Sequence, residues 1–169
     1  MSLPKESLQD RLHLATALLC AWLILTSPWV AMLRRIPTEA SWLDYAHATL
    51  GSLTVLVGIA YTIACTRGGR WRTYFPWLGG DVKSLARDVR GLFDRKMPSA
   101  ESGGLFATIE GLLLVALLAV GLTGIAWWAM QGASDALAWR GVHVVCARVL
   151  VGLIVAHVLA VATHLIELA

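Results

Sequence analysis

Four long apolar segments constrain this chain more than any other feature of its sequence. They cover about residues 12–33, 43–65, 105–129 and 141–166, and each is close to the roughly 20 residues that an α-helix needs to cross a bilayer core. Only 15% of the 169 residues are charged, against roughly 25% in soluble domains. We therefore predict an all-α fold, an integral membrane four-helix bundle that forms a single domain over residues 1–169.

The cysteines and the net charge argue against several classes of function. Cys20, Cys65 and Cys146 lie in apolar runs, without paired spacing and without a Cys-x-x-Cys-His motif. This pattern disfavours disulfides, a zinc site and covalently attached c-type haem. The formal charge is only +3, and nothing in the sequence indicates a nucleic-acid partner.

Basic residues predict the orientation of the helices. Lys5 and Arg11 precede the first segment, and eight more lie between the second and third, whereas the opposite side has only Arg34, Arg35 and Arg140. By the positive-inside rule, both termini and the long connection are cytoplasmic. Five tryptophans at the outer helix ends suggest an interfacial aromatic belt: Trp29, Trp42, Trp127, Trp128 and Trp139.

The long connection contains an amphipathic pattern over about residues 81–94. We expect Asp81 as the N-cap. Apolar and basic residues then follow at helical spacing: Val82, Leu85, Val89, Leu92 and Phe93 on one side, and Lys83, Arg87 and Arg90 on the others. This pattern predicts a helix on the cytoplasmic surface that contacts membrane lipid, with docking of a protein partner as the alternative.

The fourth segment carries three histidines, His143, His157 and His164, at intervals of 14 and 7 residues. At about 100° per residue these intervals place all three imidazoles on one face of a helix. The predicted topology puts His47 near the outer start of the second segment and His13 near the inner start of the first. Similar depth in the membrane therefore pairs His47 with His143 near the outer surface and His13 with His157 near the inner surface. His157 lies about 21 Å deeper than His143 along the last helix.

Paired imidazoles from facing helices suit b-type haem, whose iron has two axial positions left by the porphyrin. An interhelical hydrogen bond is the alternative for any single membrane histidine. A zinc or di-iron site would need clustered ligands with acidic residues among them, which two separated pairs cannot supply. His164 is the alternative to His157 as the partner of His13, although it would place the two haems about 31 Å apart, the full hydrocarbon thickness.

Three sequence motifs resemble the bacterial cytochrome b561 family: "RLHLA" opening the first segment, "HATLG" in the second, and the histidine spacing of the fourth. The resemblance covers all four segments. It implies two haems b, with His13, His47, His143 and His157 as axial ligands of the iron, and a location in the bacterial inner membrane. It also implies electron exchange with quinone.

The longer connection makes the chain look more like the cytochrome b (gamma) subunit of formate dehydrogenases and the b-type subunit of nickel-iron hydrogenases. That resemblance implies transmembrane electron transfer between a periplasmic donor and the quinone pool. The implied partners are periplasmic or membrane-bound dehydrogenase or hydrogenase subunits, or a cytochrome c, with a second copy of the chain as a further alternative. The chain departs from the gamma subunits at the start of the third segment, which reads Phe106, Ile109 and Glu110 where they have an Asn-x-x-Gln-Lys motif.

Three further residues have hypothetical roles. His164 and Glu110 are candidates for a quinone site at the cytoplasmic edge, and Arg148 is a candidate for pairing with a haem propionate. Each has a simpler alternative: a surface histidine, an acid favoured by the helix dipole, and an arginine that extends to the outer surface.

Two other functions stay open at this point. One is a stand-alone cytochrome b561 that oxidises a small donor and acts as a quinone reductase. The other, from a different class, is a non-haem membrane transporter or assembly protein whose histidines bind protons or a polar substrate. Transporters more often have broken helices or an internal repeat, and neither is evident in the sequence.

Overall fold

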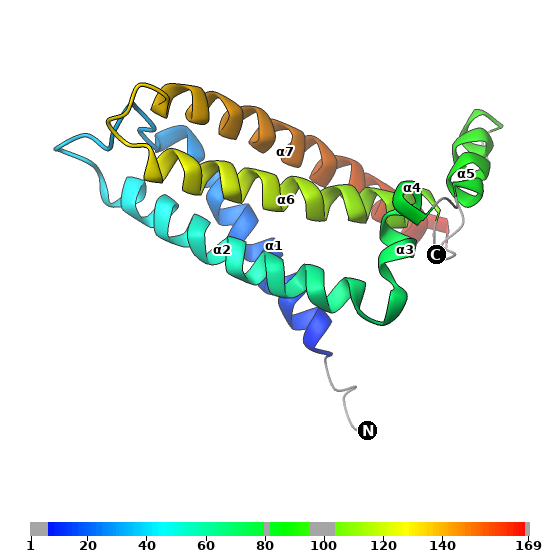
Figure 1. Cartoon of the computed structure of the whole chain (residues 1–169). Helices are drawn as coiled ribbons and strands as arrows, with labels where there is room; N and C mark the ends of the chain where they lie inside the picture. Colours follow the sequence, from blue (N-terminus) through cyan, green and yellow to red (C-terminus); the bar gives the residue numbers. More distant parts are fainter. Residues whose placement is uncertain (1–6, 80–81, 95–103, 168–169) are drawn as a thin grey trace.

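The computed structural model is an all-α membrane protein (Figure 1). It describes residues 7–79, 82–94 and 104–167, with side chains as far as residue 162. Four of its helices are long and apolar enough to cross a membrane. The predicted fold class, a membrane four-helix bundle, is therefore confirmed.

The four long helices are α1 (Leu8–Thr26), α2 (Trp42–Thr66), α6 (Leu105–Ala129) and α7 (Ala136–Glu167). α1 stops short of the expected residue 33 and continues only as the 3₁₀ turn η1 (Ser27–Trp29), because Pro28 has no N–H to donate to the preceding turn. α7 begins at Ala136 rather than near residue 141, so its first turn includes Trp139.

The long helices pack in the order α1, α2, α6, α7, and the contact between α1 and α7 is less extensive than any in this series. Glycines allow the close approach of α2 and α6. A Cβ on Gly121 would collide with the side chain of Val55, and one on Gly58 would lie 3.0 Å from Leu117. Small residues serve this purpose in membrane bundles, since they let helix backbones come close.

An apolar cluster joins α1, α6 and α7 near the middle of the bundle. Its buried members are Cys20, Ala116, Leu117 and Leu150, with Ile24, Leu113, Val120, Leu153 and Ile154 packed against them. Leu150 lies seven residues from both His143 and His157, so it lies on their face of α7. The cluster therefore fills the bundle between the two levels of histidines.

The loops at one end of the bundle, residues 30–41 and 130–135, are held together by hydrogen bonds to their backbone groups. The indole of Trp127 donates to the carbonyl of Leu33 at 2.9 Å, and the Gly132 N–H donates to the carbonyl of Arg34 at 3.0 Å. Trp127 is only 5% exposed, so its assignment to an aromatic belt is wrong. The other four tryptophans are exposed, as a belt requires.

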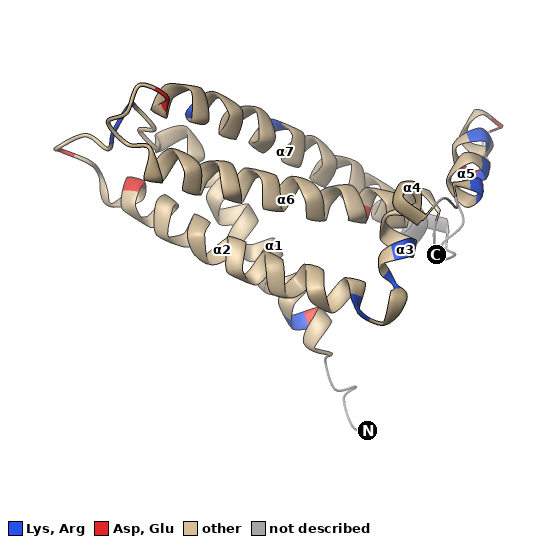
Figure 2. Cartoon of the chain, viewed as in Figure 1, with Lys and Arg blue, Asp and Glu red and all other residues tan. Residues whose placement is uncertain are grey.

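The opposite end carries the connection between α2 and α6. After the turn η2 (Arg67–Gly69) come α3 (Trp71–Tyr74), α4 (Pro76–Gly79) and α5 (Lys83–Phe93). Gly68 and Gly69 have positive φ, which lets the chain turn without strain. Figure 2 shows lysines and arginines gathered along α3 and α5. Val82 occupies the N-cap position of α5, whereas Asp81, the expected N-cap, lies outside the described residues.

Candidate functional site

Two cavities lie between the helices, one toward each end of the bundle, and each is lined by one pair of the predicted histidines. His47 and His143 line a cavity of about 520 Å³ near the loops. His13 and His157 line one of about 260 Å³ near the connection. Among the described residues no group of three or more histidine, cysteine or acidic side chains could hold a bare metal ion.

His143 is oriented by the backbone of the neighbouring helix. Its Nδ1 lies 2.9 Å from the carbonyl oxygen of Val120 on α6. A carbonyl can only accept, so Nδ1 carries the proton, and in the neutral ring Nε2 keeps an unshared pair. Metal-binding histidines have this arrangement, in which a hydrogen bond at one nitrogen fixes the tautomer and the ring orientation.

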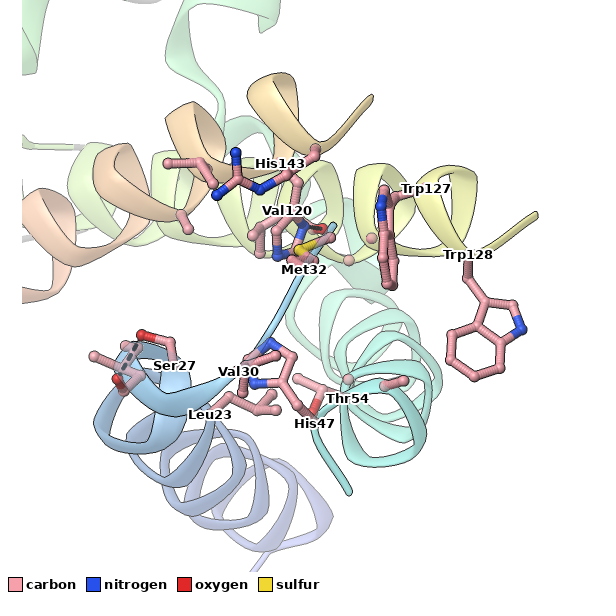
Figure 3. Close-up of a pocket in the computed structure, with 18 of the residues that line it drawn as sticks. Leu23, Ser27, Val30, Met32, His47, Thr54, Val120, Trp127, Trp128 and His143 are labelled. Atoms are coloured by element: carbon pink, nitrogen blue, oxygen red, sulfur yellow. Dashed lines mark hydrogen bonds between the residues drawn. The ribbon is translucent and has the colours of Figure 1, made fainter. Parts of the chain in front are cut away.

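His47 enters the same cavity from α2, opposite α7, as Figure 3 shows. Its Nδ1 is buried and has no hydrogen-bond partner among the described residues, although buried polar atoms are nearly always paired. Gly51 lies one turn further along and also lines the cavity, and a Cβ built on it would meet nothing within 4 Å. A flat ring could therefore approach the backbone closely beside His47.

Asp44, one turn before His47, closes the outer side of this cavity. Its buried carboxylate accepts hydrogen bonds from the Ala31 N–H at 2.6 Å and from the N–H and hydroxyl of Ser41, both at 2.8 Å. One side chain thus caps α2 and ties the loop after η1 across the cavity. This role of Asp44 could not be predicted from the sequence, where it resembles an ordinary acid in the first turn of a helix.

Two arginines of α7 also line the His47/His143 cavity, Arg140 before His143 and Arg148 after it. Arg148 was predicted as a candidate for pairing with a propionate, and Arg140 was not. A charge inside a membrane span needs a counter-charge or water. The structure therefore puts two cations beside the predicted ligands.

The His13/His157 cavity is lined mainly by polar side chains: Gln9, Asp10, His13, Tyr61, Tyr74, Glu110, His157 and Val161. The ring of His13 lies 5.7 Å from that of Tyr61 at an interplanar angle of 41°. Glu110, predicted to lie near the quinone, does reach the cavity lined by His13 and His157. The side chain of His164 lies beyond the described side chains.

Tyr61 and Tyr74 were not predicted as site residues. Both lie beside the thiol of the buried Cys65. Burial, with the nearby Cys65 and Glu110 as further causes, raises the pKa of the Tyr74 phenol above its usual value. The place of Tyr74 in the cavity wall depends on how the connection folds, because α3 brings Tyr74 back against α6.

Tyr74 is held in place by Gly111. A Cβ on Gly111 would collide with the backbone carbonyl of Tyr74, so only glycine permits α3 to pack this closely on α6. Arg70 fastens the same segment, since its guanidinium donates to Gln9 at 3.1 Å and to the Ala64 carbonyl at 2.5 Å. These contacts fix one wall of the cavity.

The sequence matches the family described as prokaryotic cytochrome b561 over residues 6–168. The chain belongs to this family. It is accordingly a multi-pass membrane cytochrome that binds b-type haem and transfers electrons, and the resemblance to bacterial cytochrome b561 is confirmed. Neither the curated proteins nor the solved structures give a significant match.

The residues of this cytochrome fit b-type haem well at the His47/His143 cavity. It offers two imidazoles from facing helices, a buried ring nitrogen at His47 that has no partner in the described part of the chain, and open space beside Gly51. Its volume of about 520 Å³ lies within the roughly 300–1,000 Å³ common for ligand sites. The other cavity has the same kind of donor pair, but its volume of about 260 Å³ lies below that range, so it fits haem less well.

Proposed function

We propose that this cytochrome holds two haems b and carries electrons across the bacterial inner membrane, between a periplasmic donor and quinone. The observation that carries the proposal is the pairing of histidines from facing helices at two levels. His47 and His143 line one cavity, His13 and His157 the other. Bundles commonly build cofactor sites from such inward-facing side chains.

The haem iron supplies the one-electron chemistry, and the protein tunes it through axial ligands, burial and nearby charge. His143 donates its Nδ1 proton to Val120, which leaves Nε2 to bind iron. Arg148 lines the same cavity and would pair with a propionate there. Cys20, Leu117 and Leu150 exclude water from the space between the two sites.

The orientation follows from the basic residues. Cytoplasmic termini put the His47/His143 site near the periplasm, where a dehydrogenase or hydrogenase subunit, or a cytochrome c, would deliver electrons. They put the His13/His157 site near the cytoplasm. The chain thus serves as the electron-transfer subunit of an oxidoreductase.

Quinone would exchange electrons beside the His13/His157 site. Quinone reduction takes up protons, and this cavity contains Glu110 and two tyrosines. His164 lies on the next two turns of α7 after His157, on the same face, and is the one histidine left without iron to bind. Glu110 and His164 are therefore our candidates for quinone contacts.

Axial-ligand variants test the two-haem assignment. The wild-type protein should contain two haems per chain in a pyridine haemochrome assay. His47→Ala and His143→Ala should each lose the same haem, whereas His13→Ala and His157→Ala lose the other, because an iron with one axial histidine is poorly held. Potentiometric titration identifies the haem that remains. One haem per chain in the wild type, or spectra that group His13 with His143, would refute the assignment.

Quinone contacts are tested separately. Glu110→Gln and His164→Leu should keep both haems and their spectra but slow the oxidation of dithionite-reduced protein by a soluble quinone analogue at least about tenfold. Glu39→Gln, an exposed loop residue that lines neither cavity, is the matched control and should leave the rate unchanged. Normal oxidation by the quinone analogue in both variants would refute a quinone site beside His13 and His157.

A further inference from the structure

The surface helix α5 presents three distinct faces. Helical spacing groups its residues by angle. One face carries Val82, Leu85, Ala86, Val89, Leu92 and Phe93; a second carries Lys83, Arg87 and Arg90; the third carries Ser84, Asp88 and Gly91. Only the third face contains a buried residue, so the helix meets the bundle through its polar side.

The apolar face is exposed although it carries large side chains. Phe93 is 86% exposed, Leu92 48%, Val82 46% and Val89 40%. α5 lies beyond the ends of the long helices (Figure 1), so these residues are not part of the apolar surface of the four spans. A contiguous apolar face of this kind normally has a partner.

Asp88 ties α5 to the start of α6. It is only 5% exposed, and its carboxylate accepts a hydrogen bond from the backbone N–H of Leu105 at 2.9 Å. Leu105 is the first residue of the third membrane span. The bond therefore ties α5 to the point where α6 enters the bilayer, which is the depth of the lipid headgroups.

The direction of α5 matches this depth. Figure 1 shows α5 running across the axis of the bundle rather than along it. A helix at headgroup depth and in the membrane plane can place an apolar face among the acyl chains and a basic face among phosphates. Anionic lipids attract basic residues at this level with about 1 kcal/mol each.

We propose that α5 is an in-plane membrane anchor that binds anionic phospholipid. Its apolar face, ending at Phe93, enters the boundary between headgroups and acyl chains. Lys83, Arg87 and Arg90 contact the lipid phosphates. Through its hydrogen bond to Leu105, Asp88 connects the anchored helix to the start of α6, the helix that carries Glu110. The proposal depends on the membrane insertion of the bundle and not on the number of haems or the direction of electron transfer.

Depth-dependent quenching tests the apolar face. The variants Phe93→Cys and Asp94→Cys are each labelled with a thiol-reactive fluorophore in nanodiscs, and wild-type protein is labelled in parallel to correct for the native cysteines. Asp94 is the matched control, because it is the next residue but lies on the basic side. Brominated lipid should quench the label at 93 at least about threefold more than the label at 94, and aqueous iodide should show the reverse. Equal iodide quenching at both positions would overturn the proposal and leave the face for a protein partner.

Hydrogen exchange tests the lipid charge. In nanodiscs of phosphatidylglycerol, the amides of α5 should exchange at least about fivefold more slowly than in phosphatidylcholine, the factor that one basic residue near an anionic surface supplies. The triple variant Lys83→Gln, Arg87→Gln, Arg90→Gln should lose this difference. The charge-conserving variant Lys83→Arg, Arg87→Lys, Arg90→Lys should keep it. Equal exchange in both lipids for the wild type, or a difference that survives in the glutamine variant, would refute binding to anionic headgroups.

Discussion

The two cavities are each lined by one pair of histidines but are built differently. The His47/His143 cavity is the larger, and backbone groups fix its parts: the Val120 carbonyl orients His143, and the loop contacts of Trp127 and Asp44 close its outer side. The His13/His157 cavity has half the volume, and its walls are mainly polar side chains.

This difference assigns distinct tasks to the two ends of one bundle. A site held by backbone hydrogen bonds keeps its geometry while charge changes, which favours electron transfer without rearrangement. A smaller polar site beside tyrosines and an acid is suited to chemistry that moves protons. α1, which supplies His13, packs mainly on α2 and less on α7, so this cavity can also widen more easily.

The largest effect that separates the two sites should come from Gly111→Ala. The added Cβ meets the backbone carbonyl of Tyr74, which cannot rotate away as a side chain could, so α3 must move off α6. We expect a destabilisation of about 1–3 kcal/mol, as for overpacking in a core. Potentiometric titration should show a changed midpoint potential for the His13/His157 haem and an unchanged one for the other.

Gly152→Ala is the control for this experiment, since a Cβ there meets nothing within 4 Å. It should leave both potentials unchanged and slightly raise the thermal stability, because alanine favours a helix over glycine. If Gly111→Ala shifted both potentials equally, the two cavities would not be structurally independent.

A smaller effect, at the other cavity, should come from Gly124→Ala. Its Cβ would lie 3.1 Å from Cε1 and 3.2 Å from Nδ1 of His143, so the ring must shift by a few tenths of an ångström. We expect an altered low-temperature spectrum and midpoint potential for the His47/His143 haem alone, with stability reduced by about 1 kcal/mol. A change confined to the other haem would contradict the assignment of His143.

The sequence predicted those features that depend on periodicity. The four spans, the surface helix and the one-face spacing of His143 and His157 all follow from helical repeats, and the structure places each histidine pair on one cavity. The sequence could not predict that Tyr74 lines the His13/His157 cavity or that Asp44 binds the loop after η1. Both contacts depend on how a short connecting segment folds back onto the long helices. The assignment of Trp127 to the aromatic belt was wrong. A tryptophan at a helix end has the same sequence pattern whether its side chain faces lipid or a loop carbonyl.

The smallest expected effect tests which group orients His143. Thr123 lies near Nδ1, but its Oγ1 is 3.4 Å away and already donates to the Ala119 carbonyl at 2.8 Å. The Val120 carbonyl, at 2.9 Å, is the better acceptor for the Nδ1 proton. Thr123→Val should therefore leave the spectrum and potential of the His47/His143 haem unchanged and alter stability by no more than about 0.5 kcal/mol. If this variant shifted that potential as much as Gly124→Ala does, the threonine hydroxyl rather than the backbone would orient the ligand. The contrast between a site fixed by the backbone and one fixed by side chains would then be lost.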